Sequence, residues 1–140
     1  IPSMVQRALK NEPILVYGDG QQSRCFSSVT DVVRGMLLLM DSPEAEGEVF
    51  NVGSDEECSV MELAQRIKRM CHSDSPIETV AYEAVYGRSF EDMRRRVPDL
   101  RKIRRFVGYR PLVTLDGLLE ATIRDACDQM GIPCPLVATA

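Results

Sequence analysis

The sequence has no tryptophan and a single histidine, His72, and its longest uninterrupted apolar run is the short segment Met36–Met40. One histidine excludes any metal site or catalytic mechanism that needs two. A run of this length is far too short to cross a bilayer, so we expect no membrane partner. His72 itself is interpreted as a surface residue near the end of a helix.

Cysteines are present but lack the spacing of a structural framework. The five cysteines are odd in number, widely separated, and contain no Cys-x-x-Cys pair. This pattern argues against a disulfide scaffold or a zinc ribbon and predicts a reducing, cytoplasmic location. No signal peptide opens the sequence, and Ile1 rather than Met stands first, so we expect a fragment or a processed product.

Length and charge place the chain among ordinary globular domains. It has 140 residues, of which 44% are hydrophobic and 27% charged, values close to the globular average. The net charge is −4 and the isoelectric point about 5.1. An acidic chain has no general affinity for nucleic acid, so we expect no nucleic-acid partner, although a local basic patch would still attract anions.

Hydrophobic periodicity predicts a mixed α/β fold with about five helices and a few short strands, without a complete Rossmann sheet. The predicted domain covers residues 1–134, and 135–140 form a tail. One expected helix starts at Thr30 or Asp31 and runs through Met40, with an apolar stripe that we expect to be buried. The other expected elements are helices at 3–10, 60–71, 98–107 and 115–130, strands at 14–17, 24–29, 49–52 and 77–82, and an irregular loop at 83–97.

The segment Gly18–Ser23 superficially resembles a dinucleotide-binding fingerprint but departs from it in two ways. Ser23 stands where the third glycine belongs, and a strand pattern follows instead of a helix that would hold a pyrophosphate at its N-terminus. It is therefore interpreted as a tight connection between two strands. The sequence also lacks a P-loop, a zinc-protease motif, a Gly-x-Ser-x-Gly elbow and a Tyr-x-x-x-Lys pair.

Positive charge is concentrated between Arg94 and Arg105, where six arginines and Lys102 surround a single acid, Asp99. The cations from Arg101 onward alternate with apolar residues and fit the solvated face of a helix. The three arginines before Pro98 fall in the expected loop, where guanidinium groups suit phosphate oxygens. The residues alone leave three alternatives open: a phosphate site shared with Arg24, a non-enzymatic anion- or RNA-binding module that uses the whole segment, and a structural or interaction domain without a ligand. The absence of interleaved aromatics argues against the RNA reading.

Three segments in order resemble nucleotide-sugar epimerases, dehydratases and decarboxylases of the extended short-chain dehydrogenase/reductase superfamily. PILVYGDGQQSRCFSSVTDVVRGMLLLM from Pro13 resembles the family's Y-G-x-G-x-Q-x-R-x-F-x-x-V-x-D segment. FNVGSDEECSVMELAQRI from Phe50 looks like its N-[IV]-G strand and capped helix. RRRVPDLRKIRRFVGYRPLVTLDGLLEATI from Arg94 is similar to its R-x-P-D segment and terminal helix. Together they cover nearly the whole chain.

The resemblance implies that the chain is only the C-terminal, substrate-binding half of such an enzyme. In the family, the N-terminal half supplies the Rossmann sheet, the NAD site and the catalytic Tyr and Lys with a Ser or Thr. No catalytic residue is therefore expected here, NAD is expected to bind outside this chain, and the chain alone is expected to be inactive. The parent enzyme is expected to be a homodimer, and the isolated chain to expose an apolar patch and self-associate.

The resemblance also assigns binding residues. Arg24 matches the arginine that grips the diphosphate, and Arg96 matches a second phosphate-binding arginine, with Arg95 as the alternative because the preceding loop varies in length. Gln22 matches a polar position near the nucleotide.

The strand through Leu15 and Tyr17 is expected to pass beside the nucleobase. The implied activity is an NAD-dependent reaction on a nucleotide sugar, expected to be a UDP-sugar. The overall resemblance ranks 4-epimerisation ahead of decarboxylation and dehydration.

Overall fold

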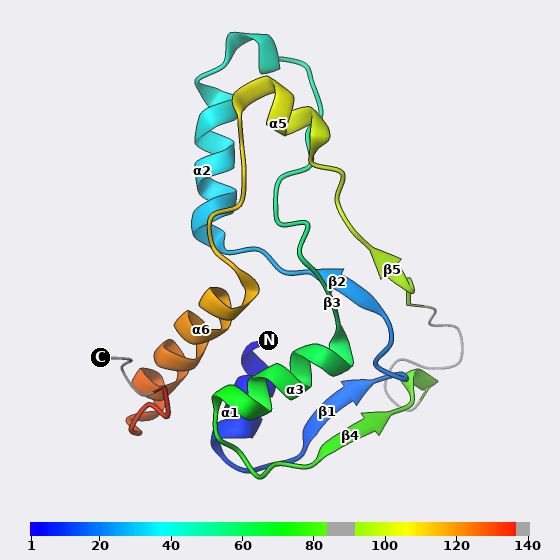
Figure 1. Ribbon diagram of the computed structural model, residues 1–140, viewed down its shortest axis with the longest axis vertical. Helices are drawn as coiled ribbons and strands as arrows, with labels where there is room; N and C mark the ends of the chain where they lie inside the picture. The colour runs from blue at the N-terminus through cyan, green and yellow to red at the C-terminus, as the bar shows by residue number, and fades with distance from the viewer. Residues whose placement is uncertain (84–91, 137–140) are drawn as a thin grey trace.

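Helices and short strands follow one another along the chain, as the periodicity predicts. The computed structural model describes residues 1–83 and 92–136. The fold is a small mixed α/β arrangement with two small sheets (Figure 1). The elements are α1 (Pro2–Leu9), β1 (Ile14–Tyr17), β2 (Ser23–Cys25), α2 (Val29–Met40), a 3-10 turn η1 (Pro43–Ala45), β3 (Glu57–Ser59), α3 (Val60–Met70), β4 (Ile77–Val80), β5 (Arg95–Arg96), α5 (Arg101–Val107) and α6 (Leu115–Met130).

The strands form two separate sheets within the described part of the chain. β1 pairs with β4 in parallel, with Ile14 opposite Ile77. β2 is the central strand of the other sheet, antiparallel to β3 and parallel to β5. The described strands therefore form no complete doubly wound sheet.

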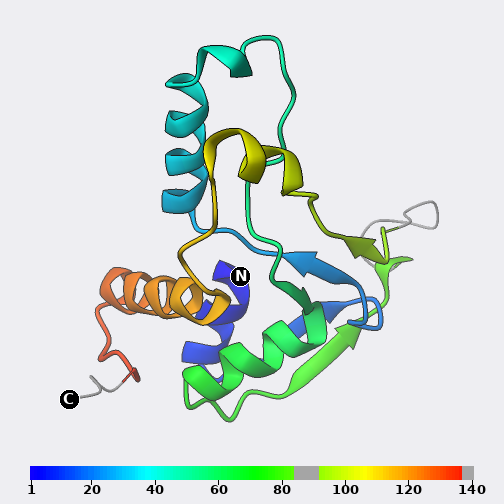
Figure 2. The ribbon, with the colours of Figure 1, turned by 45° about the horizontal axis from the view of Figure 1, so that its top comes forward.

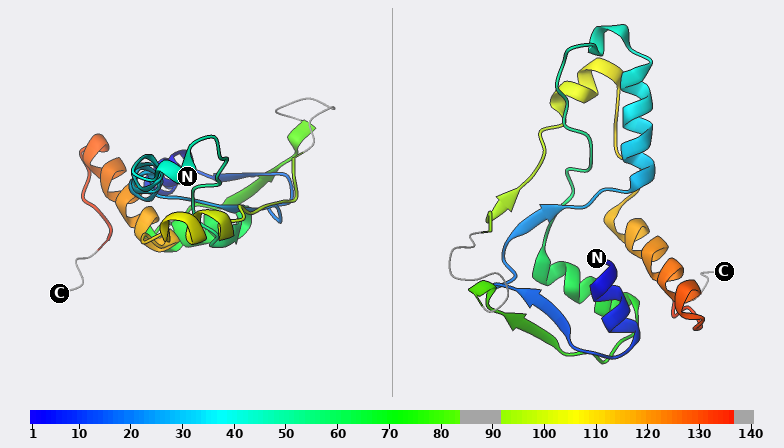
Figure 3. Two further views of the ribbon diagram at one scale, coloured as in Figure 1. Left: turned by 90° about the horizontal axis from the view of Figure 1, so that it is seen from above. Right: turned by 180° about the vertical axis from the view of Figure 1, so that it is seen from behind.

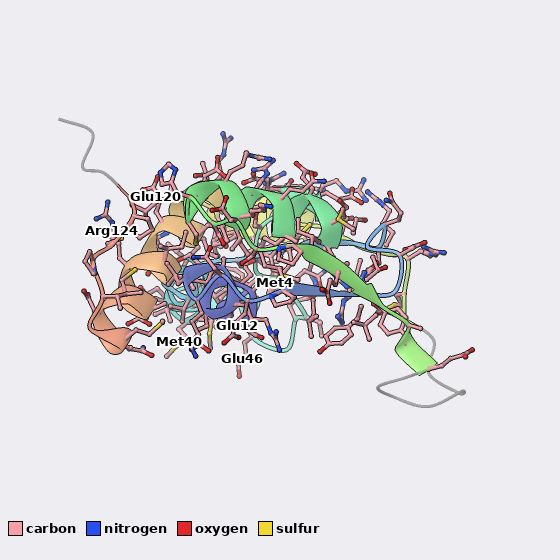
Figure 4. The ribbon with its side chains drawn as sticks, turned by 90° about the horizontal axis from the view of Figure 1, so that it is seen from below. Met4, Glu12, Met40, Glu46, Glu120 and Arg124 are labelled. Atoms are coloured by element: carbon pink, nitrogen blue, oxygen red, sulfur yellow. The ribbon has the colours of Figure 1, made fainter. Side chains whose placement is uncertain are left out.

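The main hydrophobic core lies between β1 and the helices α1, α3 and α6 (Figures 1 and 2). Ile14 and Val16 point into it from β1 and are fully buried. Each helix contributes a buried stripe at helical spacing, and α6 presents Leu119 and Ile123. Figure 4 shows the opposite side of α6, where Glu120 and Arg124 lie at the outer rim.

Local sequence signals set the ends of two of these helices. The Ser59 hydroxyl accepts a hydrogen bond from the Glu62 amide at 3.1 Å, which starts α3 as the Ser-x-x-Glu pattern predicts. Thr114 caps α6 in the same way, through the Gly117 amide at 3.2 Å. Gly131 ends α6 with a φ of 63°, which favours glycine. None of the described helices combines the length and apolarity that crossing a bilayer requires.

A second, smaller region joins α2 to α5 (Figure 3). Tyr109 is fully buried at its centre and donates a hydrogen bond from its hydroxyl to the Gly53 carbonyl at 2.8 Å. Gly35 lets α2 approach closely, since a Cβ there would lie 2.7 Å from Val52 and 2.9 Å from the Tyr109 ring. The inward face of α2 is therefore set by a glycine and a tyrosine.

The expectation that the apolar stripe of α2 is buried is wrong. Val33, Met36, Leu37 and Met40 are 47%, 53%, 54% and 78% exposed. The buried residues of α2 are Asp31 and Gly35, on the side that faces Tyr109. Figure 4 labels Met40 at the end of this helix. The helix is amphipathic as predicted, but no residue of the described part of the chain covers most of its apolar side.

Two further expectations about this region need correction. Ser28, rather than Thr30 or Asp31, caps α2 by accepting a hydrogen bond from the Thr30 amide. Asp31 instead accepts bonds from the amides of Leu112 and Val113, which ties α2 to the segment before α6. Residues 49–52 form no strand, because this apolar run packs against α5 and finds no strand partner there.

Candidate functional site

The three-stranded sheet brings together two arginines that lie far apart in the sequence. Arg24 of β2 is the register partner of Arg96 of β5. Side chains at paired positions of neighbouring strands lie on the same face of the sheet, so both arginines face one way. Arg95 and Arg96 were expected in a loop, and this is wrong. Backbone pairing with β2, including the bond from the Ser23 amide to the Arg94 carbonyl at 2.8 Å, makes them a strand.

A surface pocket of about 810 Å³ opens on this face of the sheet. Arg24 and Arg96 both contribute to its lining. Asn51 and Asp99 also line it and are joined by a hydrogen bond from the Asn51 side-chain amide to the Asp99 carbonyl at 3.2 Å. The full lining consists of Arg24, Cys25, Phe26, Asn51, Arg96, Val97, Pro98 and Asp99. The pocket therefore combines two guanidinium groups with an apolar wall.

The three consecutive arginines before Pro98 have different surroundings. Arg94 pairs with Asp19, and Arg95 forms a two-pronged ion pair with Glu57 away from the pocket. The Arg96 side chain is exposed and makes no hydrogen bond or ion pair with any described residue. Of the two positions that the resemblance offered for a second phosphate-binding arginine, only Arg96 lines the pocket that contains Arg24.

Arg24 is held in place from inside the protein. One terminal nitrogen forms an ion pair with Asp92, and the other donates to the Ser23 carbonyl at 2.7 Å. A guanidinium carries five N–H donors in a fixed plane, so these two bonds leave three donors for another group. The side chain is only 14% exposed, which fixes its direction before any ligand arrives.

A chain of hydrogen bonds continues from Asp92 into the protein. The Tyr82 hydroxyl donates to Asp92 at 2.6 Å and accepts from the Gln22 side-chain amide at 2.8 Å. The same amide nitrogen donates to the Tyr17 carbonyl at 2.7 Å. Burial, the bond to Asp92 and the charge of that carboxylate raise the pKa of Tyr82 to about 12, so the phenol stays a donor at neutral pH.

The remaining predicted residues lie in or beside this network and do not line the pocket. Gln22 is buried and turned toward Tyr17 and Tyr82. Leu15 and Tyr17 occupy the half-exposed face of β1, opposite its buried residues. Sequence reasoning missed Asp92 as the partner of Arg24. The available signal was a pair of acids, Glu91 and Asp92, shortly before three arginines, but the partner of Asp92 lies 68 positions away along the chain.

Family membership follows from residues 1–122, which match the family model described as GDP-mannose 4,6 dehydratase. The chain belongs to this family. It is 40% identical over 124 residues to a UDP-N-acetyl-alpha-D-glucosaminuronate decarboxylase of Bacillus cytotoxicus, which covers 89% of this chain and 38% of that protein. The chain thus spans well under half the length of this relative.

Solved structures of family members share the fold. A UDP-glucose 4-epimerase of Thermotoga maritima, solved with UDP-glucose, matches with a TM-score of 0.80 and 27% identity over 91% of this chain and 39% of its own. A UDP-glucuronic acid 4-epimerase of Bacillus cereus, solved with UDP-glucuronic acid and NAD, matches with a TM-score of 0.78 and 23% identity over 91% of this chain and 38% of its own. These two solved structures therefore share the fold of this chain.

The segment Gly18–Ser23 of this family member does not fit a dinucleotide-binding turn. The turn at Gly18 and Gly20 joins β1 to β2, so no helix N-terminus stands behind it to receive a pyrophosphate. Both glycines have positive φ, and a Cβ on Gly18 would lie 2.5 Å from the Tyr82 ring. These glycines serve a tight turn. No cluster of three metal-ligating side chains occurs among the described residues either.

Proposed function

We propose that this chain is the C-terminal, substrate-binding part of an NAD-dependent nucleotide-sugar enzyme and that Arg24 and Arg96 hold the diphosphate of a UDP-sugar. The observation that carries the proposal is their placement as register partners on one face of a sheet, both lining one pocket. The proposed binding unit covers residues 1–134.

The geometry suits a ligand with two adjacent negative charges. Guanidinium groups form paired, charge-assisted hydrogen bonds with phosphate oxygens, each worth about 1.5–3 kcal/mol. Arg96 has no competing partner among the described residues, and Arg24 retains three N–H donors. Binding energy from the nucleotide, which does not react, serves to orient the sugar for chemistry elsewhere.

The nucleobase is proposed to lie along β1, near Leu15 and Tyr17. Gln22 takes an indirect part, because its buried amide joins the Tyr17 carbonyl to Tyr82. Arg95 is no longer favoured as a ligand, since its guanidinium is engaged by Glu57.

Decarboxylation of a UDP-uronic acid becomes the first choice of reaction, ahead of 4-epimerisation and dehydration. The support is the 40% identity with a UDP-sugar decarboxylase, against 27% with a solved 4-epimerase. In each case the hydride acceptor NAD and the catalytic Tyr and Lys are proposed to lie in a part of the enzyme outside these 140 residues. The chain alone is proposed to bind substrate without turning it over.

The RNA-binding alternative loses support from the ion pairs of the basic segment. Arg94, Arg95, Arg101, Lys102 and Arg104 each pair with an acid, so in the described structure only Arg96 and Arg105 of this segment lack one. A surface neutralised in this way has little left to attract a polyanion.

Titration calorimetry with UDP-glucose tests the proposal. Arg24→Ala and Arg96→Ala are each expected to weaken binding by at least about tenfold, as loss of a charge-assisted phosphate contact requires. Arg95→Ala is the matched control, because it removes the same charge from the opposite face of the same strand. The proposal fails if the unchanged chain does not bind UDP-glucose, or if Arg95→Ala weakens binding as much as the other two.

A further inference from the structure

Arg24 already has a counter-ion in the described structure. Its guanidinium forms an ion pair with Asp92, and the two side chains are only 14% and 26% exposed. A partly buried pair of this kind is screened by solvent less than a surface pair, but its exposed part still responds to salt. Any anion that binds Arg24 therefore meets the field of the Asp92 carboxylate.

The charges of the site do not balance those of a nucleotide sugar. Arg24 and Arg96 carry two positive charges, and Asp92 removes one of them. Asp99 also lines the pocket but is paired with Arg101. The diphosphate diester of a sugar nucleotide carries one negative charge on each phosphoryl group. While Asp92 stays charged and in place, one phosphoryl charge is matched by Arg96, and the other has to share Arg24 with a carboxylate.

Asp92 is fixed by more than its contact with Arg24. The Tyr82 hydroxyl donates to its second oxygen at 2.6 Å, and Tyr82 is in turn bound by the buried amide of Gln22. The Gln22 carbonyl oxygen is itself buried with no hydrogen-bond partner among the described residues, so this amide is held in place by the two bonds of its nitrogen. Because the oxygen of Asp92 that does not pair with Arg24 is bound to Tyr82, the carboxylate remains beside Arg24 when the free donors of that arginine bind a ligand.

We propose that Asp92 sets the affinity of the diphosphate site by competing with phosphate for Arg24. This inference rests on the proposed function of Arg24 and Arg96. It assigns to Asp92 a cost in binding that is electrostatic and depends on ionic strength. If Asp92 merely oriented Arg24, its removal would weaken binding. If it competes with phosphate for Arg24, removal of its charge strengthens binding.

The test measures UDP-glucose affinity for Asp92→Asn, Asp92→Glu and Glu57→Gln at low and high salt. Asp92→Asn keeps the shape and removes the charge, and we expect binding to tighten by about five- to tenfold at low salt and by less at high salt. Asp92→Glu keeps the charge and should stay near the original affinity. Glu57→Gln makes the same charge change on the opposite face of the sheet and should leave affinity nearly unchanged.

The outcomes separate this inference from the proposed function. Tighter, salt-dependent binding by Asp92→Asn alone supports both. Unchanged or weaker binding by a folded Asp92→Asn protein, with UDP-glucose still bound by the original chain, overturns the role of Asp92 and leaves the diphosphate site standing. Equal tightening by Glu57→Gln also overturns it, because the effect would then follow net charge. If no variant binds UDP-glucose, both proposals fall.

Discussion

The region around α1, α3 and α6 and the region around α2 and α5 use amphipathic helices of the same kind but cover them differently. In the former, three helices and β1 bury most of one another's apolar stripes. In the latter, the buried hydrophobic cluster of the described residues consists of Leu100, Ile103 and Tyr109, while most of the apolar side of α2 faces outward. An apolar stripe in the sequence thus identifies a helix, but whether the stripe is buried depends on which other elements pack against that helix.

The difference fits a chain that forms part of a longer protein. Contiguous exposed apolar surface is uncommon on a monomer and marks a contact with another surface. We propose that the outward face of α2 packs against the remainder of the parent enzyme, and that in its absence this face drives self-association. Substitutions at three places test this difference in burial between the two regions, and we expect them to differ in their effect on the free energy of unfolding.

The largest effect is expected in the enclosed core. Leu119→Ala removes a fully buried side chain of α6 and should lower the free energy of unfolding by about 3 kcal/mol, through lost burial and the cavity left behind. Met36→Ala on the exposed face of α2 should change it by less than about 0.5 kcal/mol. Urea denaturation measures both. Similar losses for the two variants would contradict the contrast between the regions.

An intermediate effect is expected at Asp31, which joins α2 to the segment before α6. Burial raises the pKa of its carboxyl, but the bonds from the Val113 amide, Arg34 and the Leu112 amide outweigh burial and bring the pKa below its usual value of 3.8. Asp31→Asn replaces one acceptor oxygen with an NH2 group, so some of these donors lose their acceptor, and it should cost about 2 kcal/mol at pH 7.

The pH dependence at Asp31 follows from the sign of that shift. A lowered pKa in the folded state gives stability that is present above the usual value and lost as pH falls through the lowered one. The difference between the original chain and Asp31→Asn should therefore shrink as the pH is lowered from 5 toward 2. A difference that stays constant over this range would show that the charge of Asp31 contributes nothing.

The smallest effect on stability, with a large effect on assembly, is expected on the outer face of α2. Replacing Val33, Met36 and Leu37 together by Gln removes exposed apolar surface, so the unfolding free energy should change by less than about 1 kcal/mol. Sedimentation should show self-association for the original chain and monomers for the variant. An original chain that is monomeric and binds no hydrophobic dye would contradict this expectation.

Much of the local structure was predictable from the sequence, because short-range chemistry determines it. The caps at Ser59 and Thr114 and the helix end at Gly131 follow from hydrogen bonds within one turn and from backbone freedom at glycine. The short strand at 14–17 followed from its β-branched and aromatic content. The predicted strand at 49–52 failed because an apolar run of this length equally suits a segment packed against a helix.

The candidate site was predictable only in part. The resemblance singled out Arg24 with Arg95 or Arg96, and the sheet register distinguishes the last two, since adjacent residues of a strand point to opposite faces. Asp92, Tyr82 and Gln22 could not be joined from sequence, because their contacts span turns and strands far apart in the chain.

The sequence by itself determined the family, the class of fold and most helix ends, since these rest on motifs and on interactions between neighbours in the chain. Only the tertiary structure decided which face of α2 is buried, which arginine joins Arg24, and which acid stands beside it. Those three facts depend on strand register and on contacts between distant segments, and no local pattern of residues carries that information.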